Sequence, residues 1–588
     1  MYRHMKPQSI INTIFLTAVS VYSFRLFIPH DPGFIWFIIA VLTYSCFSGV
    51  HLQKMETKTI ISAAVLGFLL SLMCFFSYQL KLNNAIYFDI QAIISALGLA
   101  LFFFYALAGI FFYLLNHPRL STYKSVNNAV NRRVLLFLIS FIVILACWTP
   151  YFIACFPGNL TSDSIGEIRQ QLGLSPLSNH HPVIHQIMIR LCMLPWIHSG
   201  NIQNGVILYT VLQMTFTAAI FSYCIVFMAS KHVPKKALFC ILLFYSCYTI
   251  NGFFSVTMYK DVPFAGIVLL FSIFLVNELC DEYNQKGLLP DKLNIVILVV
   301  LAFLFCTVRN NGYYAFIIGF IFIILFNLKH FRRLLVIFIA TLLLVNSYYF
   351  ILFNITGAKK SASGEMLGLP LHMIARVVKE DNPDLSAEDF IIIKEVIPDY
   401  QVLADNYVPD NSDPIKGNGV FLADAFDKNP VRYLKSWLKI GLQYPRTYID
   451  AFLLHTQGFW DVNKNSSTIS AYVYDNEFGI TQSERSEPLR VFLINLHTFL
   501  SNNSIISPFY SIGFMVVLFL FSFVLLLIKG QLQVASPIFI LAALWLTVIA
   551  GPCCLYHYVY GLTVTIPLFL SLALILPRRN NHSHVFPS

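Results

Sequence analysis

The stretch from residue 293 to residue 333 reads LNIVILVVLAFLFCTVRNNGYYAFIIGFIFIILFNLKHFRR. It contains two apolar runs, 293–308 and 312–328, which are separated by the short polar turn Arg309-Asn310-Asn311. Each run is close to the length at which an apolar helix crosses the hydrocarbon core of a bilayer, about 17–25 residues. A basic cluster follows the second run, as is typical of the cytoplasmic end of a membrane helix. The stretch therefore predicts two membrane spans joined by a tight turn.

The same pattern recurs along most of the chain. Of its 588 residues, 57% are hydrophobic and only 12% are charged, whereas soluble proteins carry roughly 25% charged residues. The mean hydropathy is +0.69. We therefore expect an all-α polytopic membrane protein with about fourteen transmembrane helices. The predicted spans are 9–27, 34–50, 58–78, 86–115, 133–155, 204–229, 235–252, 262–279, 293–308, 312–328, 332–355, 509–528, 532–551 and 557–576.

The positions of Lys and Arg orient these predicted spans. If the N-terminus is cytoplasmic and the spans alternate, 19 Lys and Arg residues lie inside and 5 lie outside, the long loop 356–508 set aside. Short cytoplasmic loops of membrane proteins carry this excess of cations. Much of the net charge of +10 is therefore an orientation signal, and not evidence for a nucleic-acid partner. We expect a multi-pass protein of the plasma membrane with both termini in the cytoplasm.

Spans and loops divide the chain into parts. The predicted parts are four additional N-terminal helices at 1–130, a transmembrane core at 131–355, a mainly helical extracytoplasmic loop domain at 356–508, and C-terminal transmembrane helices with a cytoplasmic tail at 509–588. The core includes a polar outer loop at 156–204. In the loop domain, Asn429-Pro430 opens a long amphipathic run that ends near Leu454. Its pattern fits a helix on the outer membrane surface and equally a core helix of the loop domain.

Polar and ionisable residues gather at the predicted outer ends of the helices. Because such groups are costly near a membrane, they usually serve function. All of them lie on the same side in the predicted topology, so we expect one extracytoplasmic site. The segments are Ser162-Asp163-Ser164 with Glu167, Asn179-His180-His181-Pro182 with His185, Tyr259-Lys260-Asp261, Arg309-Asn310-Asn311-Gly312, and Tyr556-His557-Tyr558.

Each group also has a local explanation. Asp163 is a candidate N-cap for a helix that begins at Ser164, because Asp is favoured at that position. Lys260 and Asp261 are neighbours that can form an ion pair with each other. Arg309, in a short turn, can contact lipid phosphates. The sequence alone leaves these readings open beside the functional one.

A metal site is a further alternative. His180, His181 and His185 are ordinary loop residues or ligands, and a zinc site needs a third or fourth ligand in suitable geometry. The segment Ser162-Asp163-Ser164 lacks a second acid beside Asp163. We therefore assign no metal ligand and no cofactor, and a divalent metal stays open.

Taken in order, these segments resemble the GT-C superfamily of membrane glycosyltransferases, and more closely an uncharacterised group of such proteins from Gram-positive bacteria. The resemblance covers about 130–588. It rests on Pro157-Gly158 with Asp163, His181-Pro182, Lys260-Asp261, Arg309-Asn310-Asn311-Gly312, Gly368-Leu369-Pro370 with Arg376, Gly458-Phe459-Trp460 and the closing aromatic span. Many relatives have Arg-Tyr in that last span, where this chain has His557-Tyr558.

The resemblance implies a polyprenyl-phosphate sugar as donor and a cell-surface glycan or cell-wall polymer as acceptor, both used at the outer face among membrane lipids. It also implies that the first-loop acid is the catalytic base: Asp163, with Glu167 in reserve. An inverting transfer needs a carboxylate that accepts the proton of the attacking hydroxyl. Cations at the outer helix ends stabilise the leaving phosphate. The candidates are Lys260 and Arg309, then Arg376 and His181, with Asp261 orienting Lys260 and with Asn310, His180, His557 and Tyr558 in supporting positions.

Three other classes of protein remain as alternatives. A lipid-linked glycan polymerase shares the outer-face lipid substrate. A flippase or transporter usually shows charges near the bilayer midplane or inverted repeats, and neither is clear in this sequence. The last class is a scaffold or receptor that binds through the long loop. A soluble nucleotide-sugar donor is disfavoured, because the sequence contains no Gly-rich phosphate loop.

Overall fold

The computed structural model describes residues 7–24, 33–50, 52–116, 130–279, 291–361, 363–417 and 419–579. Within these ranges the only β-structure is a set of isolated bridges, and the regular elements are helices. The predicted all-α class is therefore confirmed. The predictions about the two chain ends fall outside the described residues.

Helices occupy all the runs that the sequence predicted as spans. They are α1 (Pro7–Phe24), α2 (Gly33–Gly49), α3 (Thr57–Asn83), α4 (Ile90–Asn116), α5 (Val130–Ala154), α8 (Ile202–Ser230), α9 (Lys235–Cys247) with α10 (Thr249–Ser255), α11 (Asp261–Leu279), α12 (Asp291–Thr307), α13 (Asn311–Phe326), α14 (Phe331–Asn354), α23 (Ile512–Ile528), α24 (Leu532–Ala535) with α25 (Ile538–Ile549), and α26 (Tyr560–Ile575).

Eight segments of the described chain are long and apolar enough to cross a membrane. They are α3, α4, α5, α8, α11, the segment Leu328–Asn354 with α14, the segment Leu532–Ile549 with α24 and α25, and the segment Tyr556–Ile575 with α26. The bent pair α9 and α10 makes a ninth if it is one span. The shorter apolar helices are α1, α12, α13, α23 and the segment Val183–Trp196. This composition identifies a helical membrane protein.

One predicted span is broken. The sequence predicts a single helix over 235–252, but α9 and α10 meet at an angle of 49° at Tyr248. The Tyr248 hydroxyl hydrogen-bonds Tyr556 at 2.9 Å and donates to the Phe509 carbonyl at 2.7 Å. The Asn251 amide donates to the carbonyls of Phe244 and Tyr245, which the break leaves without helical partners. Side-chain contacts therefore stabilise the bend.

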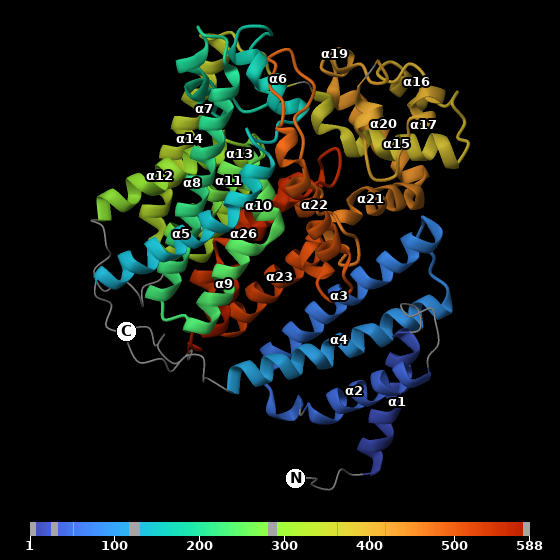
Figure 1. The fold of residues 1–588 in the computed structure, drawn as a ribbon. Helices are drawn as coiled ribbons and strands as arrows, with labels where there is room; N and C mark the ends of the chain where they lie inside the picture. The colour runs from blue at the N-terminus through green and yellow to red at the C-terminus, as the bar shows by residue number, and fades with distance from the viewer. Residues whose placement is uncertain are drawn as a thin grey trace.

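The loop domain lies beside the membrane helices (Figure 1). Its buried apolar side chains form a core of their own. Its predicted mainly helical character agrees with the described helices. They are α15 (Gly368–Glu380), α16 (Glu388–Lys394), α17 (Tyr400–Asp405), α18 (Asp413–Lys416), α19 (Ala423–Phe426), α20 (Pro430–Gln443), α21 (Pro445–Trp460) and α22 (Glu487–Asn502). The amphipathic run predicted from Asn429 to Leu454 is two helices, α20 and α21, separated at Tyr444. Asn429 caps α20 by accepting from the backbone of Arg432.

The first outer loop carries two further helices, α6 (Ser162–Gln171) and α7 (Val183–Met193), which pack on each other, and α7 also packs on α8. Figure 1 shows them at the end of the bundle that also faces the loop domain, whereas α1 to α4 lie to one side. The N-terminal helices contact the rest of the chain through α3, which packs on α21 and α23, and through Phe111 of α4, whose ring stacks on Phe521.

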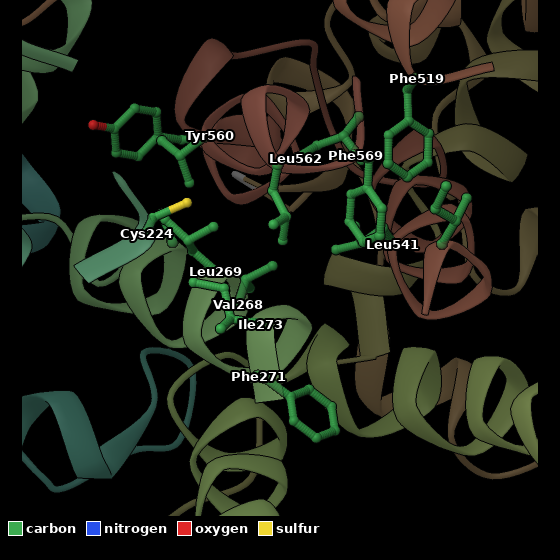
Figure 2. Close-up of a cluster of buried hydrophobic side chains, with 14 of the residues drawn as sticks. Cys224, Val268, Leu269, Phe271, Ile273, Phe519, Leu541, Tyr560, Leu562 and Phe569 are labelled. Carbon is green, nitrogen blue, oxygen red and sulfur yellow. The ribbon is translucent and has the colours of Figure 1, made fainter. Parts of the chain in front are cut away.

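The centre of the bundle is formed by α11 and α26, each 83% buried. Val268, Leu269 and Ile273 of α11 pack in the same buried cluster as Leu562 and Phe569 of α26 (Figure 2). Asp261 is the first residue of α11, and His557 and Tyr558 lie in the short 3-10 turn just before α26. The packing of α11 against α26 therefore fixes the level along the helix bundle at which Asp261, His557 and Tyr558 lie.

We predict that Gly312→Ala destabilises the protein by about 2–4 kcal/mol, in the range of a severe core substitution. A Cβ at this position would lie 1.9 Å from the backbone oxygen of Phe305, so α12 and α13 would have to separate. Thermal unfolding of the purified protein measures the loss. The matched control is Gly166→Ala in α6, where a Cβ meets nothing within 4 Å. It should be neutral or slightly stabilising, and equal melting temperatures for the two variants would contradict the prediction.

Candidate functional site

Asp163 lies in the first turn of α6 and does not cap it. The helix begins at Ser162 after Thr161, whose backbone N–H donates to the Ser164 hydroxyl at 3.2 Å. Ser164 in turn donates to the Met258 carbonyl at 2.8 Å. The N-cap explanation of Asp163 is therefore wrong, because Thr161 and Ser164 already provide the local capping contacts. The Asp163 side chain is 50% exposed.

Asn159 fixes the chain that leads into α6. It forms a bridge with Thr257, its side chain donates to Thr257 and to the Ser470 carbonyl, and its oxygen accepts from Gln482. These bonds join three segments that lie far apart in sequence. Asn159 is not among the site residues that the sequence predicts. Its only signal was its place in the polar segment before Asp163.

The side chains of Asp163, His181 and Lys260 lie close to one another. The Asp163 carboxylate lies 3.9 Å from His181 Nε2 and 4.0 Å from Lys260 Nζ. Lys260 Nζ lies 3.4 Å from His181 Nδ1. His181 is buried, and this burial, with the charge of Lys260 beside it, lowers its pKa to about 3. The His181 ring is therefore neutral near pH 7 and contributes hydrogen bonding but no positive charge.

Asp261 pairs with Arg309 and not with its neighbour Lys260. Arg309 Nη1 lies 2.8 Å from Asp261 Oδ1, and both side chains are buried. The guanidinium also donates to the Tyr558 carbonyl at 2.7 Å and lies over the rings of Phe264 and Tyr558. The expected orienting contact from Asp261 to Lys260 is replaced by this pair. The lipid-contact reading of Arg309 is also wrong, because its charged head points into the protein.

Tyr259 and His557 form the wall beside Lys260. Their rings stack with centroids 4.6 Å apart. The Tyr259 hydroxyl hydrogen-bonds Ser470 at 2.7 Å, and burial raises its pKa to about 12. Tyr259 therefore stays protonated near neutral pH. In the sequence, the only sign of this role is that Tyr259 directly precedes Lys260.

Glu167 lies inside the protein, one helical turn beyond Asp163. Its carboxylate contacts His185 Nδ1 at 2.5 Å, and His185 Nε2 contacts the Tyr209 hydroxyl at 2.7 Å. Tyr209 donates to Gln213, whose amide donates to the carbonyl of Thr257. These side chains are buried. This chain of contacts links α6 and α7 to the segment that carries Lys260. Glu167 therefore helps to hold α6, which carries Asp163, against that segment.

His180 and Asn310 occupy the edge of the site. The His180 ring contacts the His181 ring edge to face at 4.5 Å. Asn310 donates to the carbonyl of Asn179 at 2.9 Å and accepts from the Asn179 side chain at 3.2 Å. The turn between α12 and α13 therefore holds the histidine loop in place.

Arg376 lies in the loop domain, as its position in the sequence predicts, but its contacts are not with the other predicted site residues. It is buried in α15, where it donates to the Asn84 carbonyl at 2.7 Å and to the Tyr407 hydroxyl at 3.3 Å, and pairs with Glu380 at 3.0 Å. In the described chain these contacts tie the loop domain to the end of α3.

The metal question was also left open by the sequence. In the ranges that the structure describes, no group of three or more His, Cys, Asp or Glu side chains is arranged to hold a metal ion. His185 is engaged by Glu167 and Tyr209, and His181 faces the cation Lys260. His181 and His185 are therefore used in other contacts.

The fold and site define a helical membrane protein with a compact polar site at the ends of its central helices. The chain belongs to a family described as a family of unknown function, DUF6020, whose model matches residues 174–584. Comparison with curated proteins and with solved structures finds no match. The matched region includes His181, Lys260 and Arg309, whereas Asp163 precedes it.

We predict that Asp261→Leu and Arg309→Met each destabilise the protein by about 3–5 kcal/mol, because each leaves a buried charge without its partner. The double variant should lose much less than the sum of the two. Thermal unfolding of the wild type, both single variants and the double variant forms a double-mutant cycle. Additive losses would show that the two residues do not interact in this way.

We also predict a pH-dependent contribution from His181. Between its unfolded pKa of about 6.5 and its folded pKa of about 3, the unfolded chain binds the extra proton. The folded state therefore loses stability as the pH falls through this window, at up to about 1.4 kcal/mol per pH unit. Denaturant unfolding near pH 7 and pH 5 should show a smaller loss for His181→Asn than for the wild type. Identical losses would mean that His181 is protonated in the folded protein.

Proposed function

We propose that this protein is a GT-C-type membrane glycosyltransferase that uses a polyprenyl-phosphate sugar at the outer face of the plasma membrane. The observation that carries the proposal is the half-exposed Asp163 carboxylate beside Lys260 and His181. The two other acids of the site, Glu167 and Asp261, are buried and engaged by His185 and Arg309. Asp163 is therefore the carboxylate of this site that is accessible to a substrate.

The proposed reaction needs one proton acceptor and one stabilised leaving group. The Asp163 carboxylate accepts the proton of an acceptor hydroxyl while that oxygen forms a bond to the anomeric carbon. The bond from that carbon to the donor phosphate breaks, and the electron pair leaves with the phosphate. The configuration at the anomeric carbon inverts. The acceptor is a cell-surface glycan or a cell-wall polymer.

The charge on the departing phosphate grows near Lys260 in this proposal. Lys260 is the least buried cation of the site, with a side chain 17% exposed, whereas the Arg309 side chain is 8% exposed and already paired. A cation placed where charge develops lowers the barrier of such a reaction. We therefore assign phosphate stabilisation to Lys260, hydrogen bonding to the neutral His181, and a positioning role to Arg309.

The membrane arrangement is part of the same proposal. Fourteen spans with both termini cytoplasmic place Asp163, Lys260 and the loop domain outside the cell, and the excess of cations in the short loops on the other side supports this orientation. A lipid-linked donor suits a site at the ends of apolar helices, because its chain stays in the bilayer while its sugar phosphate reaches the polar residues.

We expect Asp163→Asn to reduce sugar transfer at least 100-fold, the usual contribution of a general base, without lowering the melting temperature. Purified protein is given a polyprenyl-phosphate sugar and an acceptor glycan, and release of the lipid phosphate is measured. Lys260→Ala should also lower transfer and should weaken use of the donor. The control Ser162→Ala changes the exposed neighbour of Asp163 and should leave transfer unchanged. Full activity of Asp163→Asn would disprove the assignment of the base.

A further inference from the structure

A groove with a volume of about 430 Å³ lies between α7 and α14, next to the C-terminal end of α6. This volume is in the range of about 300–1,000 Å³ that ligand pockets have. Its walls include Val183 and Ile187 of α7 and Tyr348 and Leu352 of α14. None of the residues around Asp163 lines it, so the groove is separate from the candidate active site.

The polar end of the groove carries a cation without a counterion. Arg190 and the amides of Gln170 and Gln171 line it together with Thr356, and none of the lining residues has a carboxylate. Arg190 donates one long hydrogen bond, 3.3 Å, to the Gln171 carbonyl. In the part of the chain that the structure describes, no acid pairs with Arg190. A guanidinium has five N–H donors in a planar fork that suits a phosphate.

The apolar end of the groove is continuous with the lipid-facing surface. Ile187 and Ile351 line the groove and are also 43% and 50% exposed. Ile351 lies near the end of α14, within the candidate span Leu328–Asn354. Exposed apolar side chains on a membrane span face lipid chains, and phosphate head groups lie at the ends of such spans. An apolar wall and an unpaired cation at that level fit a lipid with a phosphate head group.

We propose that this groove binds a phosphate-bearing membrane lipid, with the phosphate at Arg190 and the hydrocarbon chain between α7 and α14. This site goes beyond the glycosyl transfer proposed at Asp163. Asp163 and Gln171 lie at opposite ends of α6, eight residues apart, which is about 12 Å along a helix. A phosphate held at Arg190 therefore lies near the opposite end of α6 from Asp163, and we assign it to a different lipid from the donor. The protein thus has a second lipid site.

Photocrosslinking tests this proposal on the full-length protein in lipid nanodiscs. One probe is a photoreactive phosphatidylglycerol, and the other is a photoreactive polyprenyl phosphate. The labelled peptides are identified by mass spectrometry. We expect labels on α7 and α14 from one probe or from both, and the stronger label identifies the lipid class. Labelling confined to peptides elsewhere would overturn the proposal.

Two variants alter the two ends of the groove. Arg190→Ala removes the phosphate partner, and Ile187→Trp fills the apolar part from its exposed edge. Arg190→Ala should lower labelling of α7 and α14 about tenfold, the scale of a lost charged hydrogen bond. Ile187→Trp should lower the same labelling because the indole occupies the space of the hydrocarbon chain. Arg485→Ala and Leu343→Trp are matched controls at exposed positions outside the groove and should label like the wild type. Unchanged labelling in both groove variants would overturn the proposal.

The test is independent of the transfer reaction. Asp163→Asn should keep full labelling of α7 and α14 even though it loses transfer, because Asp163 does not line the groove. Loss of labelling in that variant would mean that the two sites are one. If Asp163→Asn keeps its activity while the groove variants lose their label, the assignment of the base fails and the lipid site stands.

Discussion

The buried ion pair between Asp261 and Arg309 is the contact on which the site depends. Taking two charges out of water is costly, and their mutual contact at 2.8 Å offsets part of that cost. Arg309 also donates to the Tyr558 carbonyl, whereas the buried oxygens of Asp261 accept no well-aligned hydrogen bond. The pair therefore fixes three elements against one another: the start of α11, the turn before α13 and the turn before α26. Lys260 precedes Asp261 in the chain, Asn310 follows Arg309, and His557 precedes Tyr558. The ion pair therefore also sets the positions of Lys260, Asn310 and His557.

Much of the fold follows from apolar runs, because a lipid environment leaves a chain few ways to satisfy its backbone other than a helix. The positions at which predicted helices are interrupted follow from the sequence only in part. The end of α20 at Tyr444 had a local signal, since Pro445 disfavours a helical conformation in the residue before it. The bend at Tyr248 had none, because it is stabilised by contacts with Tyr556 and Phe509, which come together only in the folded protein.

In the site, too, the sequence pattern predicted some features, whereas the packing of the folded protein decided others. The sequence predicted which segments come together, because the outer ends of spans share one level and polar residues there are few. It did not predict their pairings. Asp261 is adjacent to Lys260 in sequence yet pairs with Arg309, and Arg376, expected at the donor phosphate, instead contacts Asn84, Tyr407 and Glu380. Sequence adjacency cannot decide between partners when the packing of helices brings a distant one closer.

The site consists of an inner layer that is closed and an outer layer that is open. Glu167 with His185, and Asp261 with Arg309, are buried at contact distance, so moving either pair would expose or isolate a charge. Asp163 lies 3.9 and 4.0 Å from its two neighbours, which is longer than a hydrogen bond. A polar atom that enters between them can bond to Asp163 and to Lys260 without breaking an existing contact. The buried inner pairs thus hold the half-exposed Asp163 carboxylate and the Lys260 cation at a spacing that leaves both available to a ligand.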